Sequence, residues 1–228
     1  MRDFMHETDK LQDYVTSRGN RHALRLQRGK PVHKEKKTRL DQAQETRDRL
    51  MRIARGLFAR KGYHATGTHE IVKQAKITRG ALCHHFPRKE DLFLAVFQEV
   101  RREWIRDATR ETHSTDNKWE RFREHMKSFI RAATSPDVHR IVMIDGPAVL
   151  GWKTWREIQA LEGLTVITDA IQDGIASKII RPQPPEALAY LIIALIEESA
   201  LLVTYAKNPR EAVVRAEYAL DTLLSNMR

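Results

Sequence analysis

The chain has 228 residues, enough for one large domain or two modest ones. Hydrophobic residues make up 41% and charged residues 31%, the ordinary balance of a globular helical protein. The longest apolar run, residues 187–196, is too short to cross a bilayer, and the N-terminal region has no apolar signal core. We therefore expect a cytoplasmic protein without a membrane partner. The single cysteine, Cys83, excludes an internal disulfide and a multi-cysteine zinc site.

Positive charge is concentrated in the first half of the chain. Residues 1–103 contain 24 Lys and Arg against 13 Asp and Glu, whereas residues 104–228 contain 16 against 17. A basic half of this kind favours a polyanionic partner such as DNA. Residues 1–40 are polar and basic without an apolar period, and we expect them to form a flexible arm. Composition leaves open whether the arm contacts DNA phosphates or a minor groove, or is an extension without a function.

The first periodic segment predicts an amphipathic helix over residues 42–61. Its apolar positions recur at i, i+3, i+4, i+7 and i+8, namely Leu50, Ile53, Ala54, Leu57 and Phe58. Gly62 is expected to end the helix as a C-cap. The single apolar stripe indicates a helix that packs on the elements that follow it.

Two short helices joined by a tight turn are predicted next. Thr68 is expected to cap the first, because its hydroxyl can accept a hydrogen bond from a first-turn N–H group. A turn over residues 75–78 follows, and Thr78 is expected to cap the second helix, residues 79–86. Pro87 ends that helix, since proline cannot donate the next helical hydrogen bond.

The second short helix has an apolar and a polar face. Leu82 and Phe86 lie four residues apart and share the apolar face. The outer face then carries Arg79, Gly80, Cys83 and His84. Two helices, a tight turn and a polar, cationic outer face are typical of a helix-turn-helix that reads DNA.

This block resembles the TetR family of transcriptional regulators. The residues that carry the resemblance, in the family's order and spacing, are Ala54, Leu57, Phe58, Gly62, Tyr63, Thr66, Thr68, Ile71, Gly80, Leu82, His85, Phe86, Lys89, Leu92 and Phe93. So many constrained positions in a short segment are more specific than a helix-turn-helix alone. Two positions depart from the family: Lys76 stands in the turn where Gly is usual, and Cys83 replaces a Tyr that contacts a phosphate.

The resemblance implies an all-α protein with a three-helix DNA-binding head over residues 41–90. An effector-binding and dimerisation domain is expected over residues 91–228. The implied function is that of a homodimeric repressor that a small-molecule effector releases from a palindromic operator in double-stranded DNA. The residues expected at the DNA are Thr66, Gly67, Thr68, Thr78, Arg79, Gly80, Ala81, Cys83, His84, His85 and Lys89.

The rest of the chain also reads as helices, over residues 88–109, 118–133, 137–145, 152–177, 185–206 and 209–226. The last two are apolar enough to need a partner beyond their own core. We expect them to form a two-fold four-helix bundle with a second copy. The expected interface residues are Leu191, Leu195, Leu202, Val213, Ala216, Leu220 and Leu224. The alternative is that these stripes only close the monomer core.

Large side chains are frequent in the middle helices, where the resemblance implies a cavity for a small, often hydrophobic effector. The residues expected to line it are Trp104, Phe122, His125, Met126, Phe129, Met143, Asp145, Trp152 and Trp155. The alternative for each aromatic residue is an ordinary core position.

Signatures of catalysis and metal binding are absent from the sequence. It contains no H-E-x-x-H, P-loop, G-x-S-x-G or dinucleotide-binding motif. His84 and His85 are adjacent on a helix, where their side chains diverge by about 100° and cannot hold one ion. We therefore expect no enzyme activity, cofactor or metal. Two rivals stay open: a helical small-molecule-binding protein or enzyme without sequence-specific DNA binding, and a nucleoid or RNA protein without sequence preference.

Overall fold

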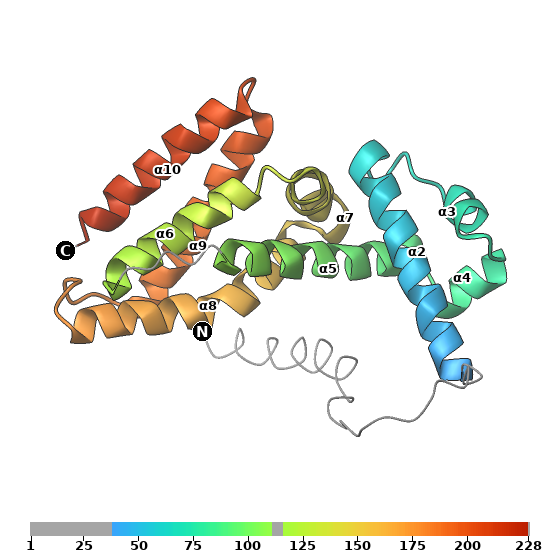
Figure 1. Cartoon of the computed structure of the whole chain (residues 1–228), viewed down its shortest axis with the longest axis horizontal. Coiled ribbons are helices and arrows are strands. Elements are labelled where there is room, and N and C mark those ends of the chain that lie inside the picture. Colours follow the sequence, from blue (N-terminus) through green and yellow to red (C-terminus); the bar gives the residue numbers. More distant parts are fainter. Residues whose placement is uncertain (1–37, 111–115, 228) are drawn as a thin grey trace, which may run out of the picture. The chain divides into compact units, whose positions relative to one another are not determined.

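The computed structural model describes residues 38–110 and 116–227, apart from the side chains of residues 160–162. The expected arm of residues 1–40 therefore lies almost entirely outside the described residues. Every regular element within the described ranges is a helix, which confirms the predicted all-α class (Figure 1).

The helices follow the predicted order, and their ends differ from the predicted ones by less than one turn. They are α2 (Arg39–Lys61), α3 (Thr68–Ala75), α4 (Arg79–His85), α5 (Lys89–Arg110), α6 (Lys118–Ala132), η1 (Val138–Asp145), α7 (Gly146–Leu150), α8 (Trp152–Ala176), α9 (Pro185–Tyr205) and α10 (Pro209–Ser225). The short α7 has no counterpart among the predicted elements.

The segment η1 differs in kind from its prediction. It is a π-helix rather than an α-helix, the form whose characteristic hydrogen bond joins an N–H to the carbonyl five residues back. Pro147, which follows in α7, has no N–H to donate to the Met143 carbonyl, and its ring crowds that carbonyl. The α-helical ladder therefore lacks its bond to the Met143 carbonyl.

The head consists of α2, α3, α4 and the first turns of α5. Phe58, Tyr63 and Phe93 form its aromatic centre, with ring centroids 5.1, 5.5 and 5.8 Å apart. Leu50 and Leu57 of the predicted α2 stripe are fully buried beside them. Edge-to-face aromatic pairs contribute about 0.5–1.5 kcal/mol each beyond the burial of their area. The head is therefore packed firmly on α5.

The two predicted helix caps have different outcomes. Thr78 caps α4 as predicted, because its Oγ1 accepts a hydrogen bond from the Ala81 N–H at 3.2 Å. The prediction that Thr68 caps α3 is wrong. Gly67 holds the cap position without a side-chain bond, and Thr68 is the first helical residue. A residue with helical backbone angles cannot turn its hydroxyl onto the N–H groups that a cap residue reaches.

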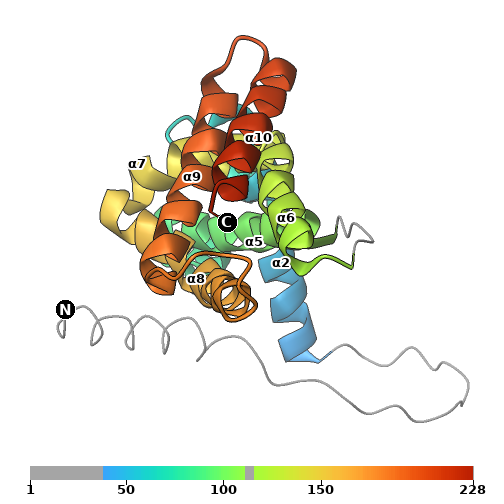
Figure 2. The same ribbon diagram turned by 90° about the vertical axis from the view of Figure 1, so that its left-hand side faces the viewer.

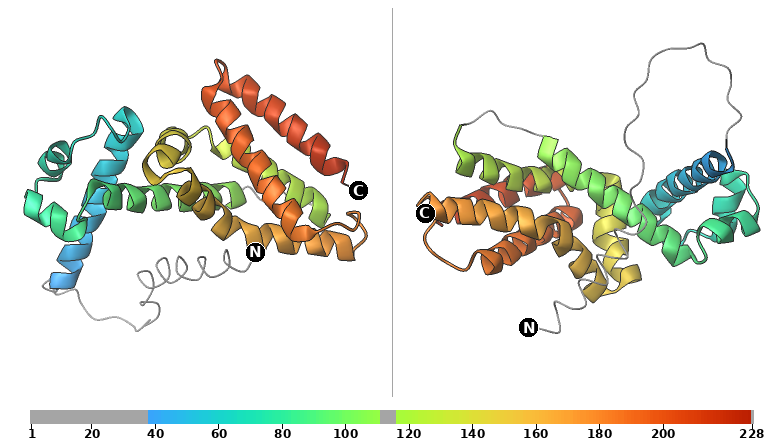
Figure 3. Two further views of the ribbon diagram at one scale, coloured as in Figure 1. Left: turned by 180° about the vertical axis from the view of Figure 1, so that it is seen from behind. Right: turned by 90° about the horizontal axis from the view of Figure 1, so that it is seen from below.

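The helix α5 extends from the head into a second group of helices (Figures 1 and 3). There it packs against α6, while α9 contacts α8, α10 and α6. Figure 2 shows α9 and α10 side by side. The apolar core is continuous from Leu50 in the head to Leu224 in α10, and Arg39–Arg228 form one compact unit.

The helix α9 is unusually apolar. An 18-residue window has a mean hydropathy of 1.9, enough by length and composition for a membrane span, and 39% of it is buried. The core helix of a water-soluble protein passes the same test, so this is weak evidence for a membrane segment. The buried fraction does show that several apolar side chains of α9 are exposed in the monomer.

The end of α3 provides a stability test, because Lys76 lies in the left-handed region with φ 52° and ψ 46°. A side chain in this region costs about 1 kcal/mol, which glycine avoids. We expect Lys76→Gly to raise the free energy of unfolding by about that amount in urea titrations. The matched control Lys73→Gly, inside the same helix, should lower it by about 1 kcal/mol. Equal losses for both variants would contradict the strain at Lys76.

Candidate DNA-binding face and effector cavity

The outer face of α4 carries most of the residues predicted at the DNA. Thr78, Arg79, Gly80, Cys83 and His84 are all exposed, whereas Leu82 and Phe86 are buried in the head core. The i, i+4 spacing of the two apolar residues thus orients the helix as predicted. Gly67, just before α3, is also exposed, while Thr68, Ala81 and His85 are half-buried.

Glycine at position 80 is not required by the fold. A methyl group there would meet only the Thr78 Oγ1, at 3.9 Å, and the backbone φ is not positive. Gly62 is the opposite case: its φ is +81°, and a Cβ would lie 2.0 Å from Nη2 of Arg140. A requirement for glycine at position 80 would therefore come from a molecule that approaches the outer face of α4.

Two residues predicted to contact DNA make hydrogen bonds within the head instead. Thr66 is fully buried, and its hydroxyl donates to the Gly62 carbonyl at 2.8 Å. The Lys89 ammonium donates to the carbonyls of Tyr63 and Thr66, each at 2.9 Å, and lies 3.9 Å from the Tyr63 ring centre. Burial lowers the pKa of Lys89, against the pull of Glu90 and Asp145. The side chains of Thr66 and Lys89 hold the loop before α3, which corrects their expected phosphate contacts.

The two histidines at the end of α4 differ in environment. Their rings lie 5.5 Å apart, and His84 is exposed while His85 is half-buried. Burial, followed by the nearby charges of His84 and Arg47, lowers the pKa of His85. His85 is therefore the one suited to packing, and His84 the one suited to an outside contact.

A buried carboxylate joins the head to η1. Asp145 accepts a hydrogen bond from the backbone N–H of Tyr63 at 2.7 Å and one from Arg140 Nε at 3.4 Å. The Arg140 guanidinium lies against Gly62, where no side chain could fit. Asp145 was expected to line the effector cavity, and this expectation is wrong, because the carboxylate is committed to the loop between α2 and α3.

A second link runs from α2. The Arg55 guanidinium bonds to Glu103 of α5, with Nη1 2.6 Å from Oε2, and also pairs with Asp137 beside η1. Its pairing could not be read from the sequence, since both partners lie dozens of positions away and neither belongs to a local motif.

A cavity of about 70 Å³ lies among α5, α6, α8 and α9. Its lining consists of Arg101, Trp104, Ile105, Phe129, Gln159, Gly163, Ile167, Ile193, Ile196 and Glu197. The Arg101 guanidinium is buried and bonds to Gln159, with Nε 2.7 Å from the side-chain oxygen and Nη2 2.9 Å from the backbone oxygen. Glu197 is buried beside them. The sequence prediction named none of these three polar residues.

Two of the residues predicted to line an effector cavity, Trp104 and Phe129, border this one. Phe122 lines a different cavity of about 120 Å³ between α6 and α8. Met126, Met143 and Trp155 are buried core residues, His125 lines neither cavity, and Trp152 is 55% exposed. The prediction counted large side chains but could not tell which way each helix turns them.

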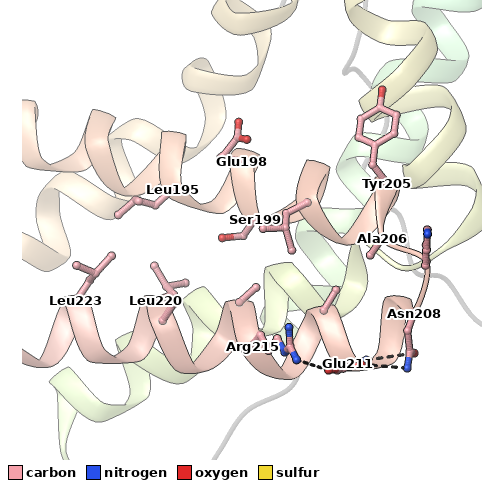
Figure 4. Close-up of a pocket in the computed structure, with 15 residues that line it drawn as sticks. Leu195, Glu198, Ser199, Tyr205, Ala206, Asn208, Glu211, Arg215, Leu220 and Leu223 are labelled. Atoms are coloured by element: carbon pink, nitrogen blue, oxygen red, sulfur yellow. Dashed lines mark hydrogen bonds and ion pairs between the residues drawn. The ribbon is translucent and has the colours of Figure 1, made fainter.

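An open apolar groove of about 720 Å³ lies between α9 and α10. Figure 4 shows Leu195 on α9 and Leu220 and Leu223 on α10 turned toward one another across it. Charged residues, Glu198, Glu211 and Arg215 among them, also line it.

Among the residues predicted for a dimer interface, Leu191 and Leu202 are more than half exposed, and Leu195 and Val213 are half-buried. Ala216, Leu220 and Leu224 are almost wholly buried within the monomer. Their stripe faces α9 and α6 of the same chain, and Ala216 and Leu220 also line the groove.

Family comparisons agree with this geometry. The described helix-turn-helix lies within a match of residues 50–96 to the bacterial regulatory proteins of the tetR family. Residues 119–227 match the tetracyclin repressor-like C-terminal domain. The chain belongs to the TetR family.

Curated relatives of this TetR-family chain are regulators. QacR of Staphylococcus aureus is 40% identical over 58 residues, 25% of this chain and 31% of QacR. AcrR of Shigella flexneri is 42% identical over 57 residues, 25% of this chain and 26% of AcrR. The chain thus matches less than a third of the length of these two. The transcriptional activator FasR of Mycolicibacterium smegmatis is 27% identical over 198 residues, 86% of this chain and 80% of FasR.

Solved TetR-family structures share the fold. A transcriptional regulator from Pectobacterium atrosepticum superposes with a TM-score of 0.72 at 29% identity, covering 84% of this chain and 97% of that one. A regulator from Cytophaga hutchinsonii gives a TM-score of 0.68 at 18% identity, covering 84% and 98%. These similarities support the arrangement of head, α5 and C-terminal helices.

Glu197 makes the stability depend on pH, since burial raises its pKa from 4.5 to about 7, against the pull of Arg156 and Arg101. Below pH 4.5 the carboxyl is protonated in both the folded and the unfolded chain, so burial has no ionisation cost. Between pH 4.5 and 7 only the unfolded chain ionises, and stability falls by roughly 3 kcal/mol. We expect Glu197→Gln to unfold at higher denaturant than the wild type at pH 8 but not at pH 4.5. The exposed neighbour variant Glu198→Gln should show no such difference, and an equal gain at both pH values would contradict the assignment.

Proposed function

We propose that this chain is a homodimeric, sequence-specific repressor that acts in the bacterial cytoplasm and that a small effector releases from a palindromic operator. The observation that supports DNA reading is the outer face of α4. It places Arg79, Gly80 and His84 in the open, with a glycine that the fold does not need. A helix of this kind fits the major groove, where Arg pairs with guanine through two hydrogen bonds.

The remaining exposed residues of the head suit phosphates. Thr78 still has a hydroxyl proton to donate, and Gly67 and Thr68 stand at the start of α3. Cys83 contributes a small neutral side chain where many relatives have a phosphate-binding Tyr. These contacts set the register of α4, and the base contacts supply the sequence preference.

The groove between α9 and α10 supports self-association. Leu202 and Leu223 are each about half exposed, at 53% and 49%, and Tyr205 is 70% exposed. A second copy that lays its own α9 and α10 against this face would complete a four-helix bundle. The two-fold axis would then present two heads to two half-sites of one operator.

The route of α5 supports release by an effector. Its first turns pack in the head, and its later residues Arg101 and Trp104 line the cavity. A ligand that prefers one tilt of α5 shifts the heads relative to the operator spacing. The Asp145 and Arg55 links carry the same movement from η1 and α5 to the loop before α3 and to α2.

Activation is a second candidate, since FasR, which aligns over most of both chains, is named an activator. Whether the protein represses or activates depends on where the operator lies relative to the promoter, and the protein sequence does not determine that position. In vitro transcription from promoters with the selected operator placed upstream or over the start site distinguishes the two. Repression requires less transcript from the second template and no gain from the first.

The role of α4 is tested on an operator selected from genomic DNA fragments. Arg79→Ala should cost about 1–3 kcal/mol of operator affinity and relax the sequence preference. Gly80→Ala should weaken operator binding at least tenfold while raising stability by about 0.5–1 kcal/mol, because alanine favours the helix. The matched control Gly56→Ala, whose methyl group meets only Arg60 Nη1 at 3.4 Å, should leave the operator affinity unchanged. Unaltered binding by both α4 variants would show that another surface reads the DNA.

The dimer face is tested with residues that are exposed in the monomer. Leu202→Asp combined with Leu223→Asp should give a folded monomer without operator binding, because each charge would enter the apolar interface. Light scattering at micromolar concentration measures the mass, and circular dichroism confirms the helix content. Val166→Asp is the control, since Val166 is 69% exposed on α8 and does not line the groove. A double variant that keeps the dimer mass would rule out this face.

A further inference from the structure

We propose that the effector is a small apolar molecule with a cationic amino group, and that Glu197 binds this cation. The site is the cavity among α5, α6, α8 and α9. The ligand class rests on the structure of the cavity, and its regulatory meaning rests on the proposed function.

The walls of the cavity are mostly apolar. Trp104 and Phe129 meet edge to face at 5.8 Å, and isoleucines of α8 and α9 complete the lining. The cavity volume of about 70 Å³ is far below the range of about 300–1,000 Å³ for drug-sized ligands. The occupant is therefore small, or it buries only one end.

Glu197 is the polar group of the cavity that lacks a donor. It is 6% exposed, and within residues 38–110 and 116–227 no hydrogen bond or ion pair to its carboxylate is found. A buried carboxylate needs donors or a cation, because desolvation disfavours its charge. Burial raises its pKa to about 7 even in the presence of Arg156 and Arg101. Those two cations therefore do not satisfy it.

The neighbouring charges point to a cationic rather than an anionic ligand. Arg101, from α5, directs two of its nitrogens at Gln159, and Arg156, from α8, lies on an exposed position. Phe129 is the lining residue from α6, and no described residue of α10 or η1 lines the cavity. An anion would place a second negative charge beside Glu197 in a dry site. An ammonium group supplies both the charge and the donors, and aromatic rings attract it as well.

The test compares three probes that each contain one benzene ring but differ in charge. They are benzylamine, which is cationic, toluene, which is neutral, and benzoate, which is anionic. Binding to the full-length protein is measured without DNA by calorimetry between pH 6 and 8. Aliphatic amines stay protonated throughout this range, since they titrate near pH 10. We expect benzylamine to bind at least tenfold more tightly than either other probe at pH 8. Its affinity should fall toward pH 6, by up to tenfold per pH unit below 7, because Glu197 must release a proton.

Variants locate the cation. Glu197→Gln should lower the affinity for benzylamine at least tenfold and remove its pH dependence, while the affinity for toluene stays the same. Glu198→Gln is the matched control, because this carboxylate is exposed and lines the groove instead. Gly163→Leu should weaken benzylamine and toluene alike, since a Cβ at this position points toward Ile193 Cδ1, 3.9 Å away.

The outcomes separate the ligand class from the proposed function. Equal or tighter binding of toluene or benzoate by the wild type, or an unchanged affinity of Glu197→Gln for benzylamine, overturns the proposal. Operator binding is measured separately with the same preparation. If amines bind as expected but never change the operator affinity, the ligand class stands and effector release fails.

Discussion

The hydrogen bond from the Tyr63 N–H to the buried Asp145 carboxylate is the contact on which the described structure depends. A hydrogen bond to a charged group contributes about 1.5–3 kcal/mol, and losing one partner would leave the other buried and unsatisfied. The bond constrains its surroundings. Gly62 must be glycine, because its backbone is left-handed and the Arg140 guanidinium fills the space of a side chain. The π-helical turn of η1 ends at the residue that makes the bond.

A single helix, α5, serves the head and the cavity. Its first residue, Lys89, holds the loop before α3 through two carbonyls. Glu103, in the same helix, pairs with Arg55 of α2, and Arg101 bonds to Gln159 of α8. Under the proposed function, a ligand in the cavity would therefore act on the same helix that carries the head.

The contacts proposed with other molecules use residues that have no evident task in the described fold. The buried polar groups of the head are hydrogen-bonded within it, as at Thr66. Arg79, Gly80 and His84 have no such structural task in the described residues, and they share one face of α4. The same reasoning applies to Leu202, Tyr205 and Leu223, which remain exposed beside an apolar groove. It also applies to Glu197, which is buried and has no hydrogen-bond donor within the described residues.

Local patterns in the sequence determined much of this protein. Helical periodicity, proline and glycine breakers and the spacing of Leu82 and Phe86 were enough to predict the helix order, the helix-turn-helix and the outer face of α4. These features depend on interactions within a few residues, so the sequence shows them directly. Tertiary structure alone decided the rest. Asp145 bonds to the loop between α2 and α3, and Lys89 bonds to two carbonyls of the same loop. Leu220 and Leu224 are buried within the monomer. Arg101, Gln159 and Glu197 lie together at the cavity. The reason is physical: each of these outcomes depends on how helices far apart in the sequence rotate and pack against one another, and periodicity shows that a face is buried without showing what buries it.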